Sequence, residues 1–386
     1  MKVLKLILKN SLRHKLRTAL TIIGIAIAVL AFGILRTVVT SWDEAVKASS
    51  PNRLITRQSV SFIFPLPYAY KDKIANVEGV KSVSFASWFQ GVYKDKNQFF
   101  ARMAVDHETF IETYDEMIVP KEQIEAFKRE RSACIIGNEL ARMYGLKLGD
   151  VMTLEGDIYP GRWDFVVRGI YKSKFKYFDP TQMFFRWDYI DERLKEETPE
   201  RAGWVGWYII RINAPDKTAV VSNNIDILFK NSPAETKTES ERAFTENFMA
   251  SFKALFTAMN FMSFAIVGII MLVLGNTMIM SARERTREYA VFKTLGFSTF
   301  HMVGLIMGES MLISLLGGGV GLAITFPMIA GFEQVIPKNY FSSFELQSIT
   351  VIFSIIAALL VGIVSAIFPI QRVLGTKIVE GFRFVG

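Results

Sequence analysis

The segment Ser281–Phe297 carries the side chains whose types and spacing best suit binding chemistry. At helical pitch, Glu284 can pair with Arg287 and Arg285 with Glu288, because residues three apart lie on one helix face. The segment also offers apolar and cationic contacts and a helix-ending glycine, namely Tyr289, Phe292, Lys293, Leu295 and Gly296. The residues alone leave two interpretations open: a solvated connector, and a helix that docks on another protein.

Signatures of enzyme active sites are absent from the sequence. It contains no Gly-x-x-x-x-Gly-Lys-Ser/Thr loop for nucleotide phosphates, no Gly-x-Ser-x-Gly elbow and no His-Glu-x-x-His helix. His14, His107 and His301 are far apart in sequence. The single cysteine, Cys134, allows neither an intramolecular disulfide nor a cysteine cluster. We therefore expect no metal and no cofactor on this chain, and no enzymatic activity of its own.

Two long apolar runs flank the charged segment, and the chain has four such runs in all. Each is about 20 to 25 residues long, enough to cross a bilayer core of roughly 30 Å as a helix. The chain has 386 residues, of which 51% are hydrophobic, and this mixture predicts a membrane part plus a sizeable aqueous domain. We expect transmembrane helices at residues 18–40, 256–280, 299–328 and 347–370.

Basic residues indicate the orientation of these helices. They concentrate before the first span, between the second and third spans and after the fourth, as Lys2, Lys5, Lys9, Arg13, Lys15, Arg17, Arg283, Arg285, Arg287, Lys293, Arg372, Lys377 and Arg383. By the positive-inside rule these segments are cytoplasmic, with both termini inside, while residues 41–250 and a loop over 329–346 lie outside. The net charge of +8 thus reflects membrane topology, and we expect no nucleic-acid partner.

Within the first 17 residues, Lys2, Lys5, Lys9 and Arg13 lie at spacings of three and four, which predicts an amphipathic helix at the cytoplasmic interface. A cleaved signal peptide would also begin with positive charges and an apolar run. The run here is longer than an ordinary signal core and no polar cleavage region follows it, so an uncleaved span is favoured. The last residues, 371–386, form a basic cytoplasmic tail.

The segment 41–250 contains both helical and strand-like stretches. Residues 68–77 and 216–230 read as helices, whereas 80–86 and 207–213 read as strands. A middle section adds a strand at Cys134, a helix over 139–144, a turn at 149–150, a second strand and a further strand over 165–171. This pattern predicts an α+β domain whose first and last parts pack together.

Three residues within the third span stand out. Gly317 and Gly321 have the Gly-x-x-x-Gly spacing that lets helices pack closely. A dinucleotide loop would need a preceding strand and a glycine where Leu322 stands. Glu309 lies about eleven residues, or roughly 16 Å, into this helix. Such a carboxylate either hydrogen-bonds a neighbouring helix or serves a proton relay, and no second ionisable residue for a relay is evident.

The charged segment resembles that of the MacB-type ABC transporter permeases, a family that includes the lipoprotein-releasing LolC and LolE permeases and, more distantly, FtsX. The resemblance rests on Glu284-Arg-Thr-Arg-Glu-Tyr-Ala-Val-Phe-Lys-Thr-Leu-Gly296, Gly308-Glu-Ser310 and Leu315-Leu-Gly-Gly-Gly-Val-Gly321. It extends to the order of the spans, to Ile136-Gly-Asn-Glu-Leu-Ala141 and Leu148-Gly-Asp150 in the exterior domain, and to the tail. The chain departs from MacB in lacking a fused ATPase.

The resemblance implies a permease in a bacterial inner membrane that pairs with a second permease chain, identical or not, and with a separate cytoplasmic ATPase that binds ATP and Mg. Residues 281–297 would be the coupling helix that docks on this ATPase. The exterior domain would have Porter-like parts near 50–100 and 205–245 and a Sabre-like insertion between them. ATP-driven closing of the dimer would move these domains by mechanotransmission.

Such systems export or extract a hydrophobic or amphipathic substrate, which includes efflux and lipoprotein release, and involve membrane lipid and a periplasmic adaptor or acceptor protein. An FtsX-like signalling permease that activates an exterior hydrolase is the alternative, although a domain of about 210 residues is larger than that role needs. A membrane receptor without any ATPase is a third. The sequence names neither the substrate nor the dimer type.

Overall fold

The computed structural model describes residues 7, 11, 13–47, 49–96, 98–250, 252–335 and 344–375, without the side chains of 42–48, 249 and 333–335. The chain divides into two compact units, one built from residues 1–41, 252–335 and 344–386 and the other from 42–251 and 336–343. Most of the predicted N-terminal helix, most of the outer loop and the tail beyond residue 375 lie outside the described residues.

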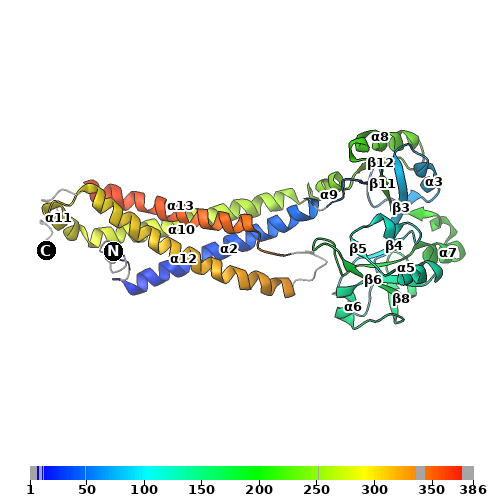
Figure 1. Cartoon of the computed structure of the whole chain (residues 1–386), viewed down its shortest axis with the longest axis horizontal. Coiled ribbons are helices and arrows are strands. Elements are labelled where there is room, and N and C mark those ends of the chain that lie inside the picture. Colours follow the sequence, from blue (N-terminus) through cyan, green and yellow to red (C-terminus); the bar gives the residue numbers. More distant parts are fainter. Residues whose placement is uncertain are drawn as a thin grey trace. The chain divides into compact units, whose positions relative to one another are not determined.

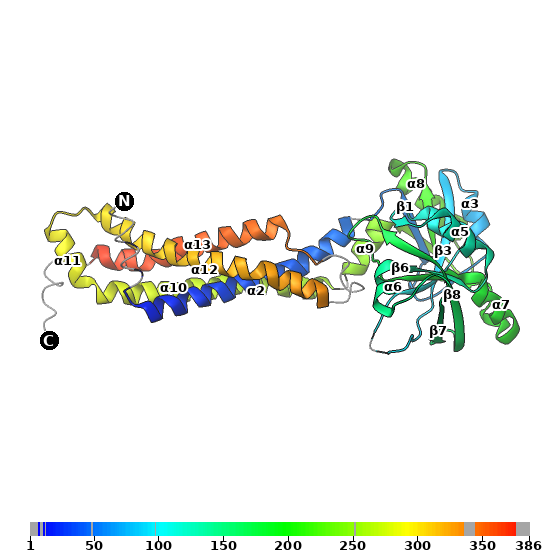
Figure 2. The same cartoon turned by 60° about the horizontal axis from the view of Figure 1, so that its bottom comes forward.

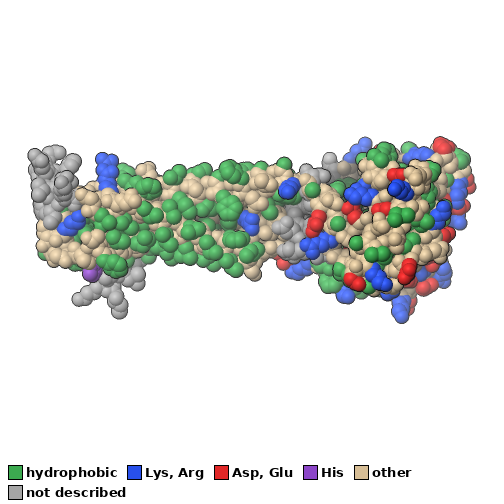
Figure 3. Space-filling model, turned by 90° about the horizontal axis from the view of Figure 1, so that it is seen from above, with side chains coloured by type: hydrophobic (Ala, Val, Ile, Leu, Met, Phe, Trp, Pro, Cys, Tyr) green, Lys and Arg blue, Asp and Glu red, His purple; other side chains and the backbone are tan. Residues whose placement is uncertain are grey.

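Four long helices make up the helical unit: α2 (Lys15–Lys47), α10 (Lys253–Glu284), α12 (Thr299–Val335) and α13 (Ser348–Gly375). Each is long and apolar enough to cross a membrane, and each contains one predicted span. They run side by side in both views, with the short helix α11 (Thr286–Thr294) between α10 and α12 (Figures 1 and 2). Hydrophobic side chains cover the face of this unit drawn in Figure 3.

Small residues set the spacing of α12 against its neighbours. A Cβ atom on Gly317 would lie 2.6 Å from Ile25 Cβ of α2, and one on Gly321 would lie 2.6 Å from the Ala26 carbonyl oxygen. The two glycines of the predicted Gly-x-x-x-Gly spacing therefore lie where α12 packs on α2. Towards α13, the Ser310 hydroxyl donates to the Gly362 carbonyl at 2.7 Å. Close approach and serine bonding are common between membrane helices.

The second unit is built on one ten-stranded sheet with the order β12-β1-β11-β3-β4-β9-β6-β8-β5, in which β7 pairs with β8. Its strands are β1 (Arg53–Gln58), β3 (Val80–Trp88), β4 (Arg102–Val105), β5 (Met117–Ile118), β6 (Ala133–Gly137), β7 (Val151–Gly156), β8 (Gly161–Ser173), β9 (Met183–Arg186), β11 (Trp207–Ile212) and β12 (Thr236–Ser240). A small second sheet pairs β2 (Leu66–Pro67) with β10 (Trp204–Val205).

Helices cover both faces of the large sheet. One face packs against α3 (Tyr70–Ala75), α6 (Asn138–Tyr144), α7 (Trp187–Glu197) and α8 (Thr218–Leu228). The other packs against α4 (Phe110–Thr113) and α5 (Lys121–Arg129), and α9 (Glu241–Ala250) ends the unit. Successive strand residues point to opposite faces, so Cys134 and Ile136 of β6 join one core while Ala133 and Ile135 join the other. Both faces are thus buried, and Cys134 is a buried free thiol.

The expected elements of this domain are present with shifted ends. The predicted helices correspond to α3, α6 and α8, and the predicted strands to β3, β6, β7, β8 and β11. The first and last parts do pack together, because β11 lies between β1 and β3 and pairs with both in antiparallel fashion. The expected two-part organisation agrees with the strand order, because β12, β1, β11 and β3 come from the two ends of the domain and the other strands come from the stretch between them. The two sets are joined by β4, which pairs with β3 on one side and β9 on the other. One sheet therefore runs through the whole unit.

Candidate functional site

The charged segment is not one helix. Residues 281–284 continue α10, and α11 begins at Thr286 after a break at Arg285, whose φ and ψ are −104° and 12°. The Thr286 hydroxyl donates to the Arg283 carbonyl at 2.8 Å, and such side-chain bonds compete with the helix ladder. The prediction of a single coupling helix over 281–297 is therefore wrong at its start. Its end agrees better, because Gly296 has a φ of +81°, which suits glycine just beyond a helix.

Arg285 is buried inside the helical unit. Its Nε donates to Glu288 Oε2 at 2.9 Å and its Nη1 to Glu309 Oε2 at 3.0 Å, and only 4% of Arg285 and 5% of Glu309 are exposed. Burial opposes the guanidinium charge, but the neighbouring Tyr289, Glu288 and Glu309 raise the pKa of Arg285. The expected Arg285–Glu288 pair is therefore present. The expected direct contact of Arg285 with another protein is not supported, because its charge is used inside this unit.

Glu309 thus has the hydrogen-bonded, inward-facing environment of the structural interpretation. Its partner, Arg285, is the ionisable neighbour that was not recognised in the sequence. The two residues come from different helices, and the spacing of charges along one helix cannot reveal such a contact. An intramembrane carboxylate with a paired cation has a much smaller energetic penalty than an isolated one.

The start of α2 and the residues before it meet the same site. Arg17 Nη1 donates to Glu284 Oε1 at 3.0 Å, His14 Nε2 lies 3.2 Å from Glu284 Oε2, and Arg13 pairs with Glu288. Among the described residues the expected pair of Glu284 with Arg287 is not formed, because Glu284 accepts from α2 instead. Burial raises the pKa of Glu288, but hydrogen bonds from Arg13 and Arg285 outweigh it and hold that pKa below its ordinary value.

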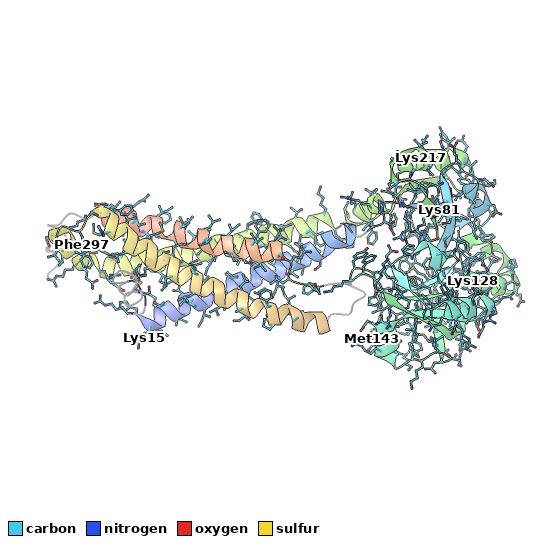
Figure 4. The ribbon with its side chains drawn as sticks, viewed as in Figure 1. Lys15, Lys81, Lys128, Met143, Lys217 and Phe297 are labelled. Atoms are coloured by element: carbon cyan, nitrogen blue, oxygen red, sulfur yellow. The ribbon has the colours of Figure 1, made fainter. Side chains whose placement is uncertain are left out.

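The far end of α11 contacts α13. Lys293 Nζ lies 3.3 Å from the Val373 carbonyl oxygen and 3.4 Å from that of Leu374, near the end of α13. Tyr289 is buried and Phe292 half-buried against the helices. Figure 4 labels Lys15 and Phe297 at the same end of the helical unit. The site therefore joins α2, α10, α11, α12 and α13 at one end of the bundle.

A second set of side chains faces solvent. We call this set the exposed patch; it consists of Arg283, Arg287, Val291, Leu295, Phe297 and Phe300. Leu295 is 68% exposed and Phe300 84%, and the two arginines are exposed in the same stretch of the chain. Apolar residues rimmed by charge mark interaction surfaces. Val291 and Phe300 were not among the predicted site residues, although their exposed positions next to Arg287 and Phe297 complete the patch.

Comparison with known proteins agrees with the architecture. Residues 18–227 match the family described as MacB-like periplasmic core domain, and residues 260–378 match the FtsX-like permease C-terminal family. The first match spans most of α2 and most of the α/β unit, and the second spans most of α10 together with α11, α12 and α13. The first match covers more than half of the chain. The chain therefore belongs to the MacB/FtsX family of ABC transporter permeases, which confirms the predicted family and fold class.

Individual relatives have modest identity. An uncharacterized ABC transporter permease of Methanocaldococcus jannaschii is 26% identical over 390 aligned residues, which cover 94% of this chain and 92% of that one. The macrolide export ATP-binding/permease protein MacB of Pectobacterium atrosepticum is 31% identical over 97 residues, 25% of this chain and 14% of that one. The extracellular domain of the ABC-type transporter YknZ has a TM-score of 0.37 at 13% identity, covering 49% of this chain and 99% of that one.

Proposed function

We propose that this chain is the permease subunit of an ABC transporter whose ATPase is a separate protein, and that the exposed patch on and around α11 docks on that ATPase. One observation carries the proposal: the same short segment presents arginine and apolar side chains to the outside and an ion network to the inside of the helical unit. Behind the patch, Arg285 bonds Glu288 of α11 and Glu309 of α12. ATP and Mg would be bound by the partner, and the patch would face the cytoplasm with both termini.

The network supplies a route for motion. Glu288 is held by Arg13 on one side and Arg285 on the other, and Arg285 in turn holds Glu309. A push on α11 would therefore act on α12 through the buried Arg285–Glu309 pair, and on the residues just before α2 through the more exposed Arg13–Glu288 pair. This supports mechanotransmission, in which movement of the ATPase changes the arrangement of the spans and, through them, of the α/β domain on the outer face.

The apolar surface of the spans favours further partners. Only 22 to 39% of the most apolar stretch of each candidate span is buried within the chain. The remainder needs lipid or another protein, because large apolar faces are not stable in water. We infer that a second permease chain, identical or not, covers part of it and membrane lipid the rest. The transporter would export or extract a hydrophobic or amphipathic substrate, handing it to an adaptor or acceptor protein where one exists.

Docking can be tested by charge reversal on the exposed patch. The double substitution R287E/L295D should abolish copurification of the cognate ATPase and reduce ATP turnover in proteoliposomes to the level of the ATPase alone. Lys15→Glu is the matched control, since Lys15 is also exposed and lies at the same end of the helical unit (Figure 4). Complex formation and coupled turnover that survive R287E/L295D would exclude this docking surface.

The alternative is a signalling permease that activates an extracytoplasmic hydrolase and transports nothing. Crosslinking of the full chain in native membranes separates the two roles. Recovery of an adaptor, a lipoprotein or lipid with the α/β domain would favour transport, whereas recovery of a cell-wall hydrolase that is activated by the complex would favour signalling.

A further inference from the structure

The α/β unit contains a cleft of about 1170 Å³ beside the end of β3. Its wall combines residues from the loop after β1, the end of β3, the turn between β7 and β8, and the β10–β11 region. Seven aromatic side chains dominate it: Phe62, Phe64, Trp88, Phe99, Tyr159, Trp204 and Trp207. Pockets for drug-sized molecules occupy roughly 300–1,000 Å³, so this cleft is large enough for one organic molecule at or above that size.

Several of these rings are presented to solvent instead of being packed away. Phe64 is 52% exposed, and Trp88 and Trp204 are each 37% exposed. Trp207 forms the floor, because it is buried and packs its ring 4.8 Å from Phe62 and 5.9 Å from Trp88. Leaving large aromatic faces in water is unfavourable. A flat apolar ligand stacked on them would remove that surface from water.

The charges around the cleft cancel. Its lining includes one acidic and one basic residue, Glu200 and Arg201, which are neighbours in sequence. Arg201 is already engaged, since its Nη2 donates to the Ile158 carbonyl at 2.8 Å and its guanidinium lies 5.4 Å from the centre of the Tyr159 ring. A buried charge needs an opposite charge or several hydrogen bonds, so a charged ligand would gain little here.

The polar groups of the lining are few and partly used within the domain. Gln58 Oε1 accepts from the backbone amides of Val60 and Ser61, and the Ser87 hydroxyl accepts from the Gly206 amide at 2.8 Å. Gln90, with a φ of +53°, is an exposed amide at the rim. Aromatic walls with a few amides at the edge suit an apolar molecule that carries one or two neutral hydrogen-bonding groups.

We infer that this cleft is a binding site for an uncharged amphipathic organic molecule with a large flat apolar surface. Its role as a transport substrate rests on the proposed function, whereas the binding itself requires neither ATP nor the ATPase. The site lies wholly within the α/β unit. Binding can therefore be assigned to this unit when it is measured on the full chain with the membrane helices in place.

Photolabelling of the full chain in lipid nanodiscs, without the ATPase, tests the site. The probe is 4-benzoylbenzyl alcohol, which is uncharged, and its comparator is 4-benzoylbenzoate, which has the same rings and a negative charge. We expect the alcohol to label peptides containing Trp88 and Trp204–Trp207 saturably, and the benzoate to label them at least about tenfold less, because its carboxylate must lose water in the cleft. Mass spectrometry locates the labelled residues.

Two exposed isoleucines provide matched variants. Ile63→Asp places a charge in the cleft wall, where Ile63 is 88% exposed, and Ile227→Asp places the same charge on α8, where Ile227 is 60% exposed. We expect I63D to reduce cleft labelling about tenfold and I227D to leave it unchanged, with both variants folded because neither position is buried. Equal labelling of the two variants, labelling confined to the helical unit, or equal labelling by both probes would overturn the inference.

This experiment can fail independently of the proposed function. Loss of the cleft site with intact ATPase docking would refute only the site. A saturable cleft site in a protein that recruits no ATPase would refute only the transporter. If the cleft is a surface for another protein, neither probe labels it saturably, and the small-molecule assignment is wrong.

Discussion

Arg285 lies where α10, α11 and α12 meet, and its contacts there determine how its substitution would affect stability. With its guanidinium hydrogen-bonded to Glu288 and Glu309, it is neither a solvent-exposed docking residue nor a passive topology signal. Breaking a buried ion pair leaves one uncompensated charge, whereas replacing both members can be nearly neutral. That asymmetry gives a test at the scale of single side chains.

We expect Arg285→Met and Glu309→Met each to destabilise the helical unit by about 3–5 kcal/mol, and the double variant R285M/E309M by clearly less than either. Thermal unfolding of the full chain in one detergent would measure all three. Arg287→Met, at an exposed position two residues away, is the control and should stay within about 0.5 kcal/mol of the wild type. Additive effects of the two single substitutions would mean that the pair does not contribute as a unit.

A pH effect is expected in the α/β unit. Burial and the nearby Arg186 lower the pKa of His107, and they outweigh the carboxylates of Asp188, Glu108 and Asp106, which raise it. The unfolded chain then binds the proton more readily than the folded chain. The stability that depends on neutral His107 is therefore present above the ordinary pKa of about 6.5 and is lost as the pH falls through it.

His107→Gln should accordingly flatten the decrease in the unfolding temperature of this unit between pH 8 and pH 5.5, as followed by circular dichroism. His301→Gln, at an exposed position in the helical unit, serves as the control and should leave that decrease unchanged. A wild-type slope in H107Q would remove His107 as the cause.

Prediction from the sequence at this scale was limited by distance along the chain. The spacing of Arg285 and Glu288 was sufficient to predict their contact, since they are three residues apart and Arg285 directly precedes α11. The Arg13–Glu288 contact joins residues 275 apart and the Arg285–Glu309 contact joins residues 24 apart. Such partners depend on which helices pack together, and a list of charges does not contain that information.

At the scale of elements, two glycines of α12 allow the effect of close helix packing on stability to be measured separately from the effect of helix propensity. A Cβ on Gly321 would lie 2.6 Å from the Ala26 carbonyl oxygen and 3.0 Å from the Ala26 Cα of α2, and backbone atoms cannot simply rotate away. Gly321→Val should therefore force α2 and α12 apart and cost about 1–3 kcal/mol.

Gly319→Val is the control, because it lies two residues away in the same helix and a Cβ there meets nothing within 4 Å. Both substitutions have the same effect on the helix backbone, so the difference between their unfolding temperatures isolates the contact with α2. Equal melting of G319V and G321V would show that this glycine is not needed for packing.

The elements also show which strands a sequence can reveal. The strands β3, β6 and β11 carry apolar residues on buried faces, and their patterns predicted them. The strand β1 was missed because it buries polar groups: Arg53 bonds Glu116 at 2.8 Å, and Thr56 bonds Thr238 at 2.9 Å. Two-residue strands such as β2 and β10 carry too little pattern to be recognised.

At the scale of the whole molecule, the order of spans and the presence of an α/β domain followed from apolar length and charge, and both hold. The cleft did not follow, because its wall is assembled from segments between Gln58 and Ala234 that only the folded sheet brings together. The partner of the exposed patch likewise could not be predicted from this sequence, because it depends on the surface of another protein.

We expect the purified chain alone in nanodiscs to hydrolyse ATP no faster than empty nanodiscs, because its sequence has no phosphate-binding loop. Addition of the cognate ATPase should give turnover that R287E/L295D lowers and K15E does not. Hydrolysis by the chain alone, after removal of copurifying proteins by a high-salt wash, would contradict the proposal that ATP is hydrolysed by a separate protein.

The joint between β3 and β4 has a mechanical consequence. Only three residue pairs, Ala86–Val105, Ser87–Ala104 and Trp88–Met103, connect these strands, yet they join the two flanks of one sheet. Bending or shear of one flank of the sheet against the other would therefore have to pass through this short ladder. Ser87 and Trp88 also line the cleft. A molecule held there would brace the ladder that joins the two flanks of the sheet, so occupancy of the cleft would set how stiffly the domain transmits force.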